Sequence, residues 1–258
     1  MFRVMWNGTS GMYAEQEKLN EISNNIANMN TVGYKSEQVS FSDLVYESLN
    51  DSKYPTSSDK TAYTGTGVKA NGWIRNNKQG NLSQTNINTD FAISGSGYFR
   101  VTTANGTKAY ERNGKFNIDG NGKLVDGNGN TLDINYSVDP NSVEFKDDNI
   151  VLLENGEIGI KGSDKKVTSV GKIDLYDTVG DDSMLSVGNN LFVPKNGVQM
   201  TVVTDPETKI YQGRLEDSNV DLATEMTDMI VAQRAFESSS KSIKMADEMW
   251  QMVNNLGK

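Results

Sequence analysis

The chain has 258 residues and a formal net charge of -9, and it contains neither histidine nor cysteine. Its length allows one large domain or two smaller ones, and an acidic chain without a basic block argues against nucleic acid or an anionic membrane surface as a partner. Without histidine and cysteine there can be no disulfide, no thiolate or imidazole metal site and no Ser-His or Cys-His nucleophile, so we expect no cofactor, no metal and no catalytic residue.

The first element expected along the chain is an N-terminal helix, because apolar residues recur there at seven-residue intervals. Met12, Leu19 and Ile26 share one heptad position, and Ile22 lies at the companion position three residues after Leu19. Such a narrow apolar stripe is typical of a helix that packs against another helix. The run Asn28–Gly33 predicts the end of this helix, since asparagine and glycine readily adopt left-handed backbone conformations.

The segment from Tyr46 to Thr66 fits neither a helix nor a strand pattern. It is polar, rich in serine, threonine, aspartate and lysine, and it contains Pro55. We interpret it as an extended insertion.

From about Val68 to Thr204 the chain is rich in asparagine and glycine, with short apolar runs between turn signals. Asn-Gly and Asp-Gly dipeptides are typical of hairpin turns in which both central residues need positive φ angles. They occur at Asn105-Gly106, Asn113-Gly114, Asp119-Gly120, Asp126-Gly127, Asn128-Gly129, Asn155-Gly156 and Asn196-Gly197. The strand candidates between them are residues 91–93, 98–101, 116–118, 150–153, 172–176 and 200–203. This texture predicts antiparallel strands joined by tight turns.

The C-terminal region carries the heptad pattern more strongly. Five large apolar residues lie seven positions apart, namely Leu222, Met229, Phe236, Ile243 and Trp250. Ser218 followed by Asp221 offers a capping signal at the start of this second helix. Gly8 and Glu15 interrupt the N-terminal stripe, and Glu225 and Ser239 interrupt the C-terminal one.

The two apolar stripes can either pair with each other or pack separately on the β region. Because each is too narrow to be stable alone and is flanked by sharply different composition, we favour helix-to-helix pairing. The expected fold is α+β, with N- and C-terminal helices paired as a coiled-coil-like domain and a central, mainly antiparallel β domain. The expected boundaries are residues 1–35 and 219–258 for the helical domain and 68–204 for the β domain, with connectors at 36–67 (insertion 46–66) and 205–218.

Three short patterns resemble functional motifs but have simpler interpretations. The Gly95-Ser96-Gly97 run lacks the third glycine and the following helix of a dinucleotide loop, so we interpret it as a turn. The stretch 119–130 mimics a calcium loop, because Asp126, Asn128 and Asn130 alternate as the first ligands of such a loop do. Counted from Asp126, however, Thr131 and Ser137 stand where the loop needs a glycine and a bidentate glutamate. The carboxylate pairs Asp147-Asp148 and Asp181-Asp182 lie in polar surroundings and are expected to be loop charges.

Several longer segments resemble the bacterial flagellar rod and hook protein family. Residues 23–35 (Ser23 to Lys35) are similar to the N-terminal signature of that family, and residues 215–222 with 229–237 are similar to its C-terminal region. In the middle of the chain, residues 80–85, 93–99 and 112–116 also match. The resemblance covers essentially the whole chain.

The resemblance implies a structural subunit, not an enzyme. Such a subunit self-assembles into a helical tube that transmits torque and surrounds the export channel, with other rod and hook proteins and the flagellar export apparatus as partners and with the basal body, outside the cytoplasmic membrane, as location. The chain lacks an apolar run of the length of a secretory signal or a membrane helix, which by ordinary rules would keep it inside the cell. The resemblance instead implies type III export without a cleaved signal.

The residues expected at the assembly interface are Met12, Leu19, Ile22, Ile26, Leu222, Met229, Phe236, Ile243 and Trp250. Length and the central motifs favour a subunit of the distal rod. A proximal rod or hook protein of the same family and, as a different class, a carboxylate-based cell-wall glycoside hydrolase remain as alternatives.

Overall fold

The computed structural model describes residues 2–48, 63–139, 143–153, 156–162, 166–180 and 183–256. The chain forms two compact units, each built from segments that are distant in sequence. The helical unit comprises Met1–Ala27, Glu37–Ile74 and Val220–Lys258, and the β unit comprises Asn28–Ser36 and Arg75–Asn219. Both chain ends therefore belong to the same unit.

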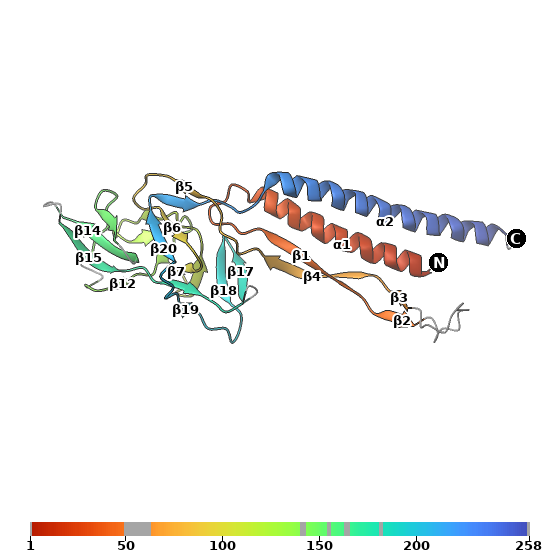
Figure 1. Ribbon diagram of the computed structural model, residues 1–258, viewed down its shortest axis with the longest axis horizontal. Helices are drawn as coiled ribbons and strands as arrows, with labels where there is room; N and C mark the ends of the chain where they lie inside the picture. Colours follow the sequence, from red (N-terminus) through yellow and green to blue (C-terminus); the bar gives the residue numbers. More distant parts are fainter. Residues whose placement is uncertain are drawn as a thin grey trace. The chain divides into compact units, whose positions relative to one another are not determined.

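The helical unit is built around two long helices, α1 (Phe2–Ala27) and α2 (Leu222–Leu256). The helices lie side by side, and strand β1 (Glu37–Asp43) packs against α1 (Figure 1). β1 pairs with β4 (Val68–Arg75), the last residue of which belongs to the β unit. The prediction of an N-terminal and a C-terminal helix is confirmed.

Local side chains and turns explain where these helices end. α1 stops at Ala27, after which the amide of Thr31 donates to the carbonyl of Asn28 at 3.0 Å and Gly33 adopts a φ of +68°. At the start of α2, the carboxylate of Asp221 accepts hydrogen bonds from the Ala223 amide (3.1 Å) and the Thr224 hydroxyl (2.9 Å). Asp221 is thus itself the N-cap, which corrects the prediction that capping begins at Ser218.

The polar insertion is described only at its two ends. β2 (Tyr46–Ser48) and β3 (Tyr63–Gly65) pair antiparallel, with Tyr46 opposite Gly65. The two ends of the insertion are therefore extended and form a two-stranded antiparallel ladder. Its remaining residues, 49–62, lie outside the described residues.

The β unit contains a nine-stranded sheet as its largest element. Its strand order is β17-β18-β8-β7-β11-β10-β9, with β16 also on β7 and β19 on β16. The strands are β7 (Tyr98–Thr102), β8 (Lys108–Glu111), β9 (Asn117–Ile118), β10 (Leu124–Val125), β11 (Thr131–Leu132), β16 (Leu175–Asp177), β17 (Met184–Gly188), β18 (Leu191–Pro194) and β19 (Thr201–Val202). Every strand pair with a described register is antiparallel, as the turn-rich sequence predicted.

Smaller sheets complete the β unit. A four-stranded sheet has the order β12-β15-β14-β13, formed by β12 (Asn135–Tyr136), β13 (Ile150–Leu152), β14 (Glu157–Lys161) and β15 (Val167–Lys172). Two further antiparallel pairs join β20 (Lys209–Gln212) with β6 (Phe91–Ser94) and β21 (Arg214–Glu216) with β5 (Leu82–Gln84). The single strand expected over residues 172–176 is wrong, because β15 ends at Lys172 and a new strand begins at Leu175.

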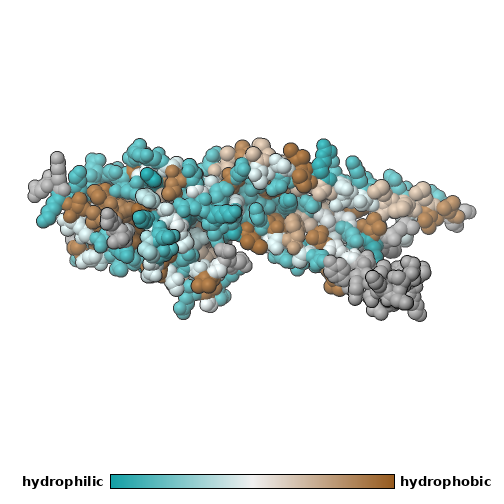
Figure 2. Space-filling model, viewed as in Figure 1, coloured by the Kyte–Doolittle hydropathy of each residue, from teal (hydrophilic) through white to brown (hydrophobic). Residues whose placement is uncertain are grey.

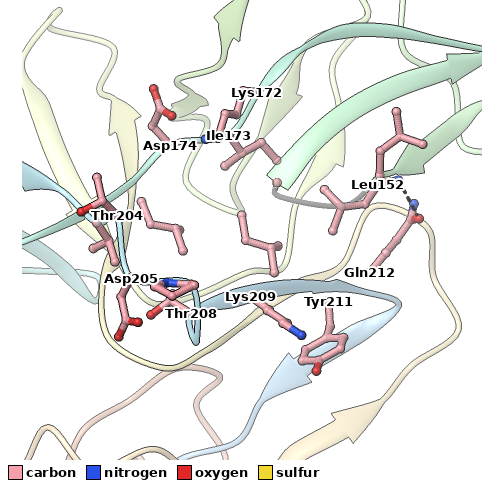
Figure 3. Close-up of a pocket in the computed structure, with 16 residues that line it drawn as sticks. Leu152, Lys172, Ile173, Asp174, Thr204, Asp205, Thr208, Lys209, Tyr211 and Gln212 are labelled. Carbon is pink, nitrogen blue, oxygen red and sulfur yellow. Dashed lines mark hydrogen bonds between the residues drawn. The ribbon is translucent and has the colours of Figure 1, made fainter.

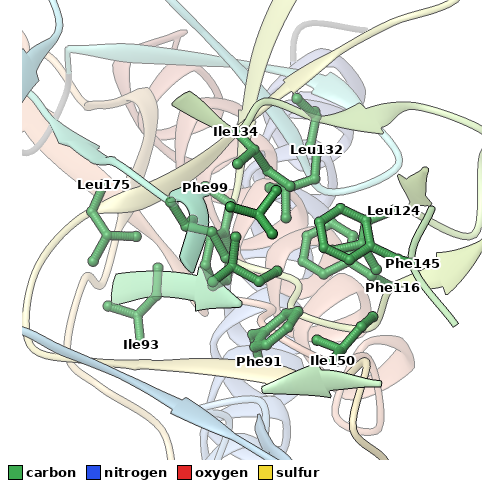
Figure 4. Packing of buried hydrophobic residues seen from close by; sticks show 14 of the residues in the cluster. Phe91, Ile93, Phe99, Phe116, Leu124, Leu132, Ile134, Phe145, Ile150 and Leu175 are labelled. Atoms are coloured by element: carbon green, nitrogen blue, oxygen red, sulfur yellow. The ribbon is translucent and has the colours of Figure 1, made fainter. Parts of the chain in front are cut away.

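The core of the β unit is formed by side chains that alternate inward from these short strands. Phe99 and Phe116 meet edge to face at 5.6 Å between ring centroids, a favourable aromatic geometry. Around them lie buried residues from several sheets, among them Phe91, Ile93, Leu124, Leu132, Ile134, Phe145, Ile150 and Leu175 (Figure 4). A core assembled from several sheets is what allows strands of only two to six residues to be stable.

The tight turns differ in detail from the expected type. In the β7–β8 hairpin only Gly106 has a left-handed backbone (φ +76°), and Asn105 does not; the Thr103 amide donates to the Thr107 carbonyl at 2.9 Å across the turn. Two-residue turns with two positive φ angles are therefore the wrong interpretation here. Longer loops with one left-handed glycine satisfy the same strand twist.

Candidate assembly interface

The two long helices lie close together at two glycines of α1. At Gly8, an added Cβ atom would lie 2.7 Å from Cγ1 of Ile243, and at Gly11 it would lie 3.2 Å from Oγ of Ser239. The contact at Gly8 is too short for a larger residue unless Ile243 or the partner helix moves, whereas at Gly11 a shift of a few tenths of an ångström would admit a small side chain. Gly8 therefore permits the helix contact, whereas the heptad pattern counted it as an interruption.

The nine residues that the heptad pattern placed at the interface differ in exposure. Ile22 is fully buried and Trp250 is 49% exposed. The other seven are half-buried, namely Met12, Leu19, Ile26, Leu222, Met229, Phe236 and Ile243. Three alanines outside the expected interface residues are more completely buried than most of these, namely Ala14 on α1 and, at the companion positions of the C-terminal heptads, Ala232 and Ala246 on α2.

A buried polar cluster lies inside the helical unit where the start of α2 meets the end of α1. Asn25 of α1 is fully buried, and its amide nitrogen lies 2.7 Å from Oε1 of Glu21 and 3.0 Å from Oε1 of Glu225 on α2. The same nitrogen donates to the Glu37 carbonyl (2.9 Å), and the Glu37 amide donates back to the Asn25 side-chain oxygen (3.0 Å). Asn25 thus connects α1, β1 and α2. Heptad analysis could not find it, because polar residues carry no signal in an apolar pattern.

Much apolar surface on the helices stays exposed. On α1, Trp6 and Tyr13 are more than two-thirds exposed. On α2 the large exposed apolar residues are Met226, Ile230, Val231, Met245, Met249, Trp250, Met252, Val253 and Leu256. Hydrophobic residues gather at the C-terminal end of this helix (Figure 2). An apolar surface of this extent on one helix marks an interaction site.

The C-terminal end of α2 extends past the N-terminal end of α1 (Figure 1). Gly8 lies against Ile243, and α1 begins six residues before Gly8, whereas α2 continues 13 residues beyond Ile243. The C-terminal turns of α2 therefore extend beyond the range of α1. Leu256, the final residue of the helix, is 87% exposed.

An apolar groove accompanies α1 within the helical unit. It has a volume of about 450 Å³ and is lined by residues of α1 and by the β1–β4 region, including Trp6, Tyr13, Leu44 and Val68. Its walls include the two exposed aromatic side chains of α1. A second apolar surface therefore lies on the same unit as the exposed face of α2.

The β unit contains a buried ion cluster whose three charged side chains come from segments that are far apart in sequence. The Glu216 carboxylate accepts hydrogen bonds from the Lys35 ammonium (2.6 Å), the Arg112 guanidinium (2.6 Å) and the Gly80 amide (2.9 Å). Arg112 also donates to the carbonyls of Gly95 (2.6 Å) and Gly97. All these groups come from the segments that carry the family resemblance.

The two cations of this cluster keep the Glu216 carboxylate ionised. Burial alone would raise the pKa of Glu216, but the adjacent Arg112 and Lys35 cations hold the pKa of this carboxyl below its ordinary value. Burial lowers the pKa of Lys35, and Glu216 opposes that effect. The side chains of Lys35 and Glu216 are only 3% and 1% exposed, so the pair is shielded from solvent. Its role is structural: it holds the segment before β1 against the segment before α2.

One buried carboxyl group of the β unit is not paired in this way. Glu111 is fully buried, and neither of its oxygens has a hydrogen-bond partner among the described residues. Burial and, to a smaller extent, nearby Asp126 raise the pKa of Glu111 to about 8. At neutral pH this side chain is therefore mainly the neutral acid.

The calcium-like loop binds its own backbone. Oδ1 of Asp126 accepts hydrogen bonds from the amides of Asn128 and Asn130, both at 2.8 Å, and Oδ2 accepts one from the Asn130 side chain at 2.8 Å. The loop's own donors thus occupy the carboxylate that would have been the first calcium ligand. Of the two carboxylate pairs, Asp147-Asp148 lies exposed in a turn, and Asp181-Asp182 lies outside the described residues.

A cavity in the β unit has a volume of about 800 Å³ and is bordered by β13, β16 and β20 (Figure 3). Gln212 closes one end, where its side-chain oxygen accepts a hydrogen bond from the Leu152 amide at 3.0 Å. The carboxylates of Asp174 and Asp205 point in opposite directions (Figure 3). They do not form the facing pair that glycoside hydrolysis requires.

Three family models match this chain in order along its length. "Flagella basal body rod protein" matches residues 5–35, "Flagellar hook protein FlgE/F/G D1 domain" matches residues 92–162, and "Flagellar basal body rod FlgEFG protein C-terminal" matches residues 211–256. Relatives named "Flagellar basal-body rod protein FlgG" match over nearly their entire length. Those from Borreliella burgdorferi and Bacillus subtilis are each 34% identical over 99% of both chains, and that from Agrobacterium fabrum is 35% identical over 98% of both.

The chain belongs to the flagellar basal-body rod protein family. This is a family of structural proteins and not of enzymes, and the chain is accordingly a structural rod subunit. Family membership implies the flagellar basal body as its location and rod and hook proteins as the class of its neighbours. Neither described helix has an apolar stretch of the length needed to span a membrane.

Proposed function

We propose that this chain is a subunit of the distal rod and that it polymerises through its two terminal helices. In the proposed assembly, α1 and α2 pair as a coiled-coil-like inner domain, and the β domain forms the outer surface of a helical tube. The tube transmits torque and surrounds the export channel. Its contacts are heterologous and do not close into a ring, so subunits add without limit along the axis.

The observation that carries this proposal is the exposed apolar face of α2. α2 carries nine large exposed apolar residues, and in an isolated chain they would remain in contact with water. A surface of this kind promotes association with another protein surface. The exposed apolar residues in the C-terminal turns of α2 and the apolar groove beside α1 are different surfaces of one unit. Two unlike surfaces favour head-to-tail contacts over a symmetric dimer.

The proposal keeps the expected organisation of the chain. In the proposed assembly, residues 1–35 and 219–258 form the inner helical domain, residues 68–204 form the outer β domain, and residues 36–67 and 205–218 connect them. The compact units divide the chain differently at these borders, because residues 28–36 and 205–219 belong to the β unit and residues 37–74 to the helical unit. Distal rod is favoured over proximal rod or hook because several relatives named FlgG align with it over nearly their whole length. Export through the flagellar type III apparatus, without a cleaved signal, would bring the subunit to the growing tip.

Phe236→Asp is expected to abolish assembly and motility while the β unit stays folded. Phe236 is half-buried on the heptad stripe of α2, and a carboxylate placed there would lose hydration without gaining a counter-charge, at a cost of several kcal/mol. The matched control is Ser238→Asp, which adds the same charge at an exposed position of the same helix. Swarming on soft agar and sedimentation of purified rods measure the effect. Normal motility of Phe236→Asp, or equal loss in Ser238→Asp, would contradict the proposed role of the stripe.

A further inference from the structure

Two carboxyl groups, one from each terminal helix, meet at a single amide group. Glu21 of α1 is 5% exposed and Asn25 is fully buried. The Asn25 nitrogen contacts one oxygen of Glu21 (2.7 Å) and one oxygen of Glu225 on α2 (3.0 Å), so the two carboxyl groups lie close together. Neither the heptad pattern nor the proposed assembly function uses these residues.

If both carboxyl groups are ionised, the hydrogen-bond acceptors around the Asn25 nitrogen outnumber its hydrogens. The Asn25 nitrogen carries two hydrogens but faces three acceptors, the two carboxylates and the Glu37 carbonyl (2.9 Å). The orientation of the amide is fixed, because its oxygen accepts the Glu37 amide at 3.0 Å. A proton on one carboxyl group would remove one negative charge from a poorly hydrated pair of like charges.

The surrounding charges do not neutralise the pair. On α1, Lys18 acts on Glu21, and on β1 the backbone amide of Val39 donates to it. On α2, the carboxylates of Asp221 and Asp228 add further negative charge beside Glu225. Glu37 of β1 faces the cluster through its backbone. Among the described groups that act on the two carboxyls, Lys18 is the one cation.

We propose that Glu21 and Glu225 form a proton-operated joint between the two terminal helices. The helices pair most tightly when one of the two carboxyl groups holds a proton, and their pairing weakens when both are ionised. The joint lies within a single subunit, so this inference goes beyond the proposed assembly function and does not depend on it.

The direction of the pH dependence follows from the environment of Glu21. Burial and then the Glu225 carboxylate raise the pKa of Glu21 from 4.5 to about 7, and burial also raises the pKa of Glu225. A carboxyl group with a higher pKa in the folded state binds its proton more tightly there than in the unfolded chain. Its contribution to stability is therefore complete below pH 4.5 and is lost as the pH rises to about 7.

The test is thermal unfolding of the helices, followed by circular dichroism at 222 nm in the full-length chain under conditions where it is monomeric. All variants carry Glu111→Gln, because that carboxyl, with its pKa near 8, would add a pH dependence of the β unit. With Glu21 and Glu225 intact, the melting temperature should be several degrees lower at pH 8.0 than at pH 5.5. Glu21→Gln, which keeps the shape of the side chain but cannot ionise, should remove most of this difference. Glu225→Gln removes only the repulsion between the two carboxylates and should make the difference smaller.

The matched control is Glu17→Gln, which neutralises an exposed carboxylate one turn earlier on α1 and should leave the pH dependence intact. The inference is overturned if the parent chain melts at the same temperature at both pH values. It is also overturned if Glu21→Gln and Glu225→Gln both keep the full difference, or if Glu17→Gln removes it equally. Failure of the proposed assembly function would appear in the motility of Phe236→Asp and not in these monomer measurements.

Discussion

Glu216→Ala is expected to lower the free energy of unfolding of the β unit by about 3–5 kcal/mol. The carboxylate is 1% exposed and is the shared partner of two buried cations, Lys35 and Arg112. Removal of Glu216 leaves both cations out of water without a counter-charge, and it also leaves the Gly80 amide without its acceptor. Urea unfolding followed by the near-ultraviolet circular dichroism of the buried tyrosines measures the loss.

The control for this variant is Glu207→Ala, which removes an exposed glutamate of the same unit and should change stability by no more than about 0.5 kcal/mol. A triple variant, Lys35→Met with Arg112→Met and Glu216→Leu, should be much more stable than Glu216→Ala, since no unpaired charge stays buried. Equal stability of Glu216→Ala and the parent chain would show that the cluster is not the electrostatic unit described above.

Gly114→Ala is the second variant with a large expected effect, a loss of at least about 2 kcal/mol at the upper end of the overpacking range. A Cβ atom at position 114 would lie 1.5 Å from the carbonyl oxygen of Phe91, so the two backbone segments must separate. Their separation would break the hydrogen bond from the Phe91 amide to the Gly114 carbonyl (2.9 Å) and would move a fully buried phenylalanine.

Gly120→Ala is the matched control, because an added Cβ atom there meets no atom within 4 Å and the backbone has no positive φ. Thermal unfolding should separate the two variants clearly, with Gly120→Ala close to the parent chain. If Gly114→Ala unfolded at the same temperature as Gly120→Ala, that result would contradict the close contact between residue 114 and the backbone of β6.

Sequence patterns predicted the parts of this fold that depend on local periodicity. The two helices follow from heptads, and most strand candidates coincide with β6, β7, β9, β13 and β19 because short apolar runs between turn residues have few alternatives. The stretch 172–176 was misread because Ile173 and Leu175 continue the apolar alternation of a strand across the gap between β15 and β16.

Contacts between distant segments explain most of what the sequence could not predict. Lys35 and Glu216 are 181 positions apart, and Arg112 and Glu216 are 104 apart, so no local pattern connects them. Gly114 was interpreted as a turn residue, whereas its importance lies in the closeness of β6. The role of Gly8 was missed in the same way. A small residue is needed there because Ile243 of the other helix lies against it, and the local sequence does not show that contact.

A disulfide between the two terminal helices tests most directly whether they pair within one subunit of the assembled rod. The chain has no cysteine of its own. An ideal Cβ atom at Gly11 lies 3.9 Å from Cβ of Ser239, within the roughly 3.5–4.5 Å that a disulfide requires. Rods isolated from cells that carry Gly11→Cys with Ser239→Cys would be oxidised and separated on a non-reducing gel, with each single variant as control. The account predicts a bond within each chain, seen as a band of monomer mass with altered mobility. Absence of that bond, or ladders of chains joined to one another, would contradict the pairing of α1 with α2 in the same subunit.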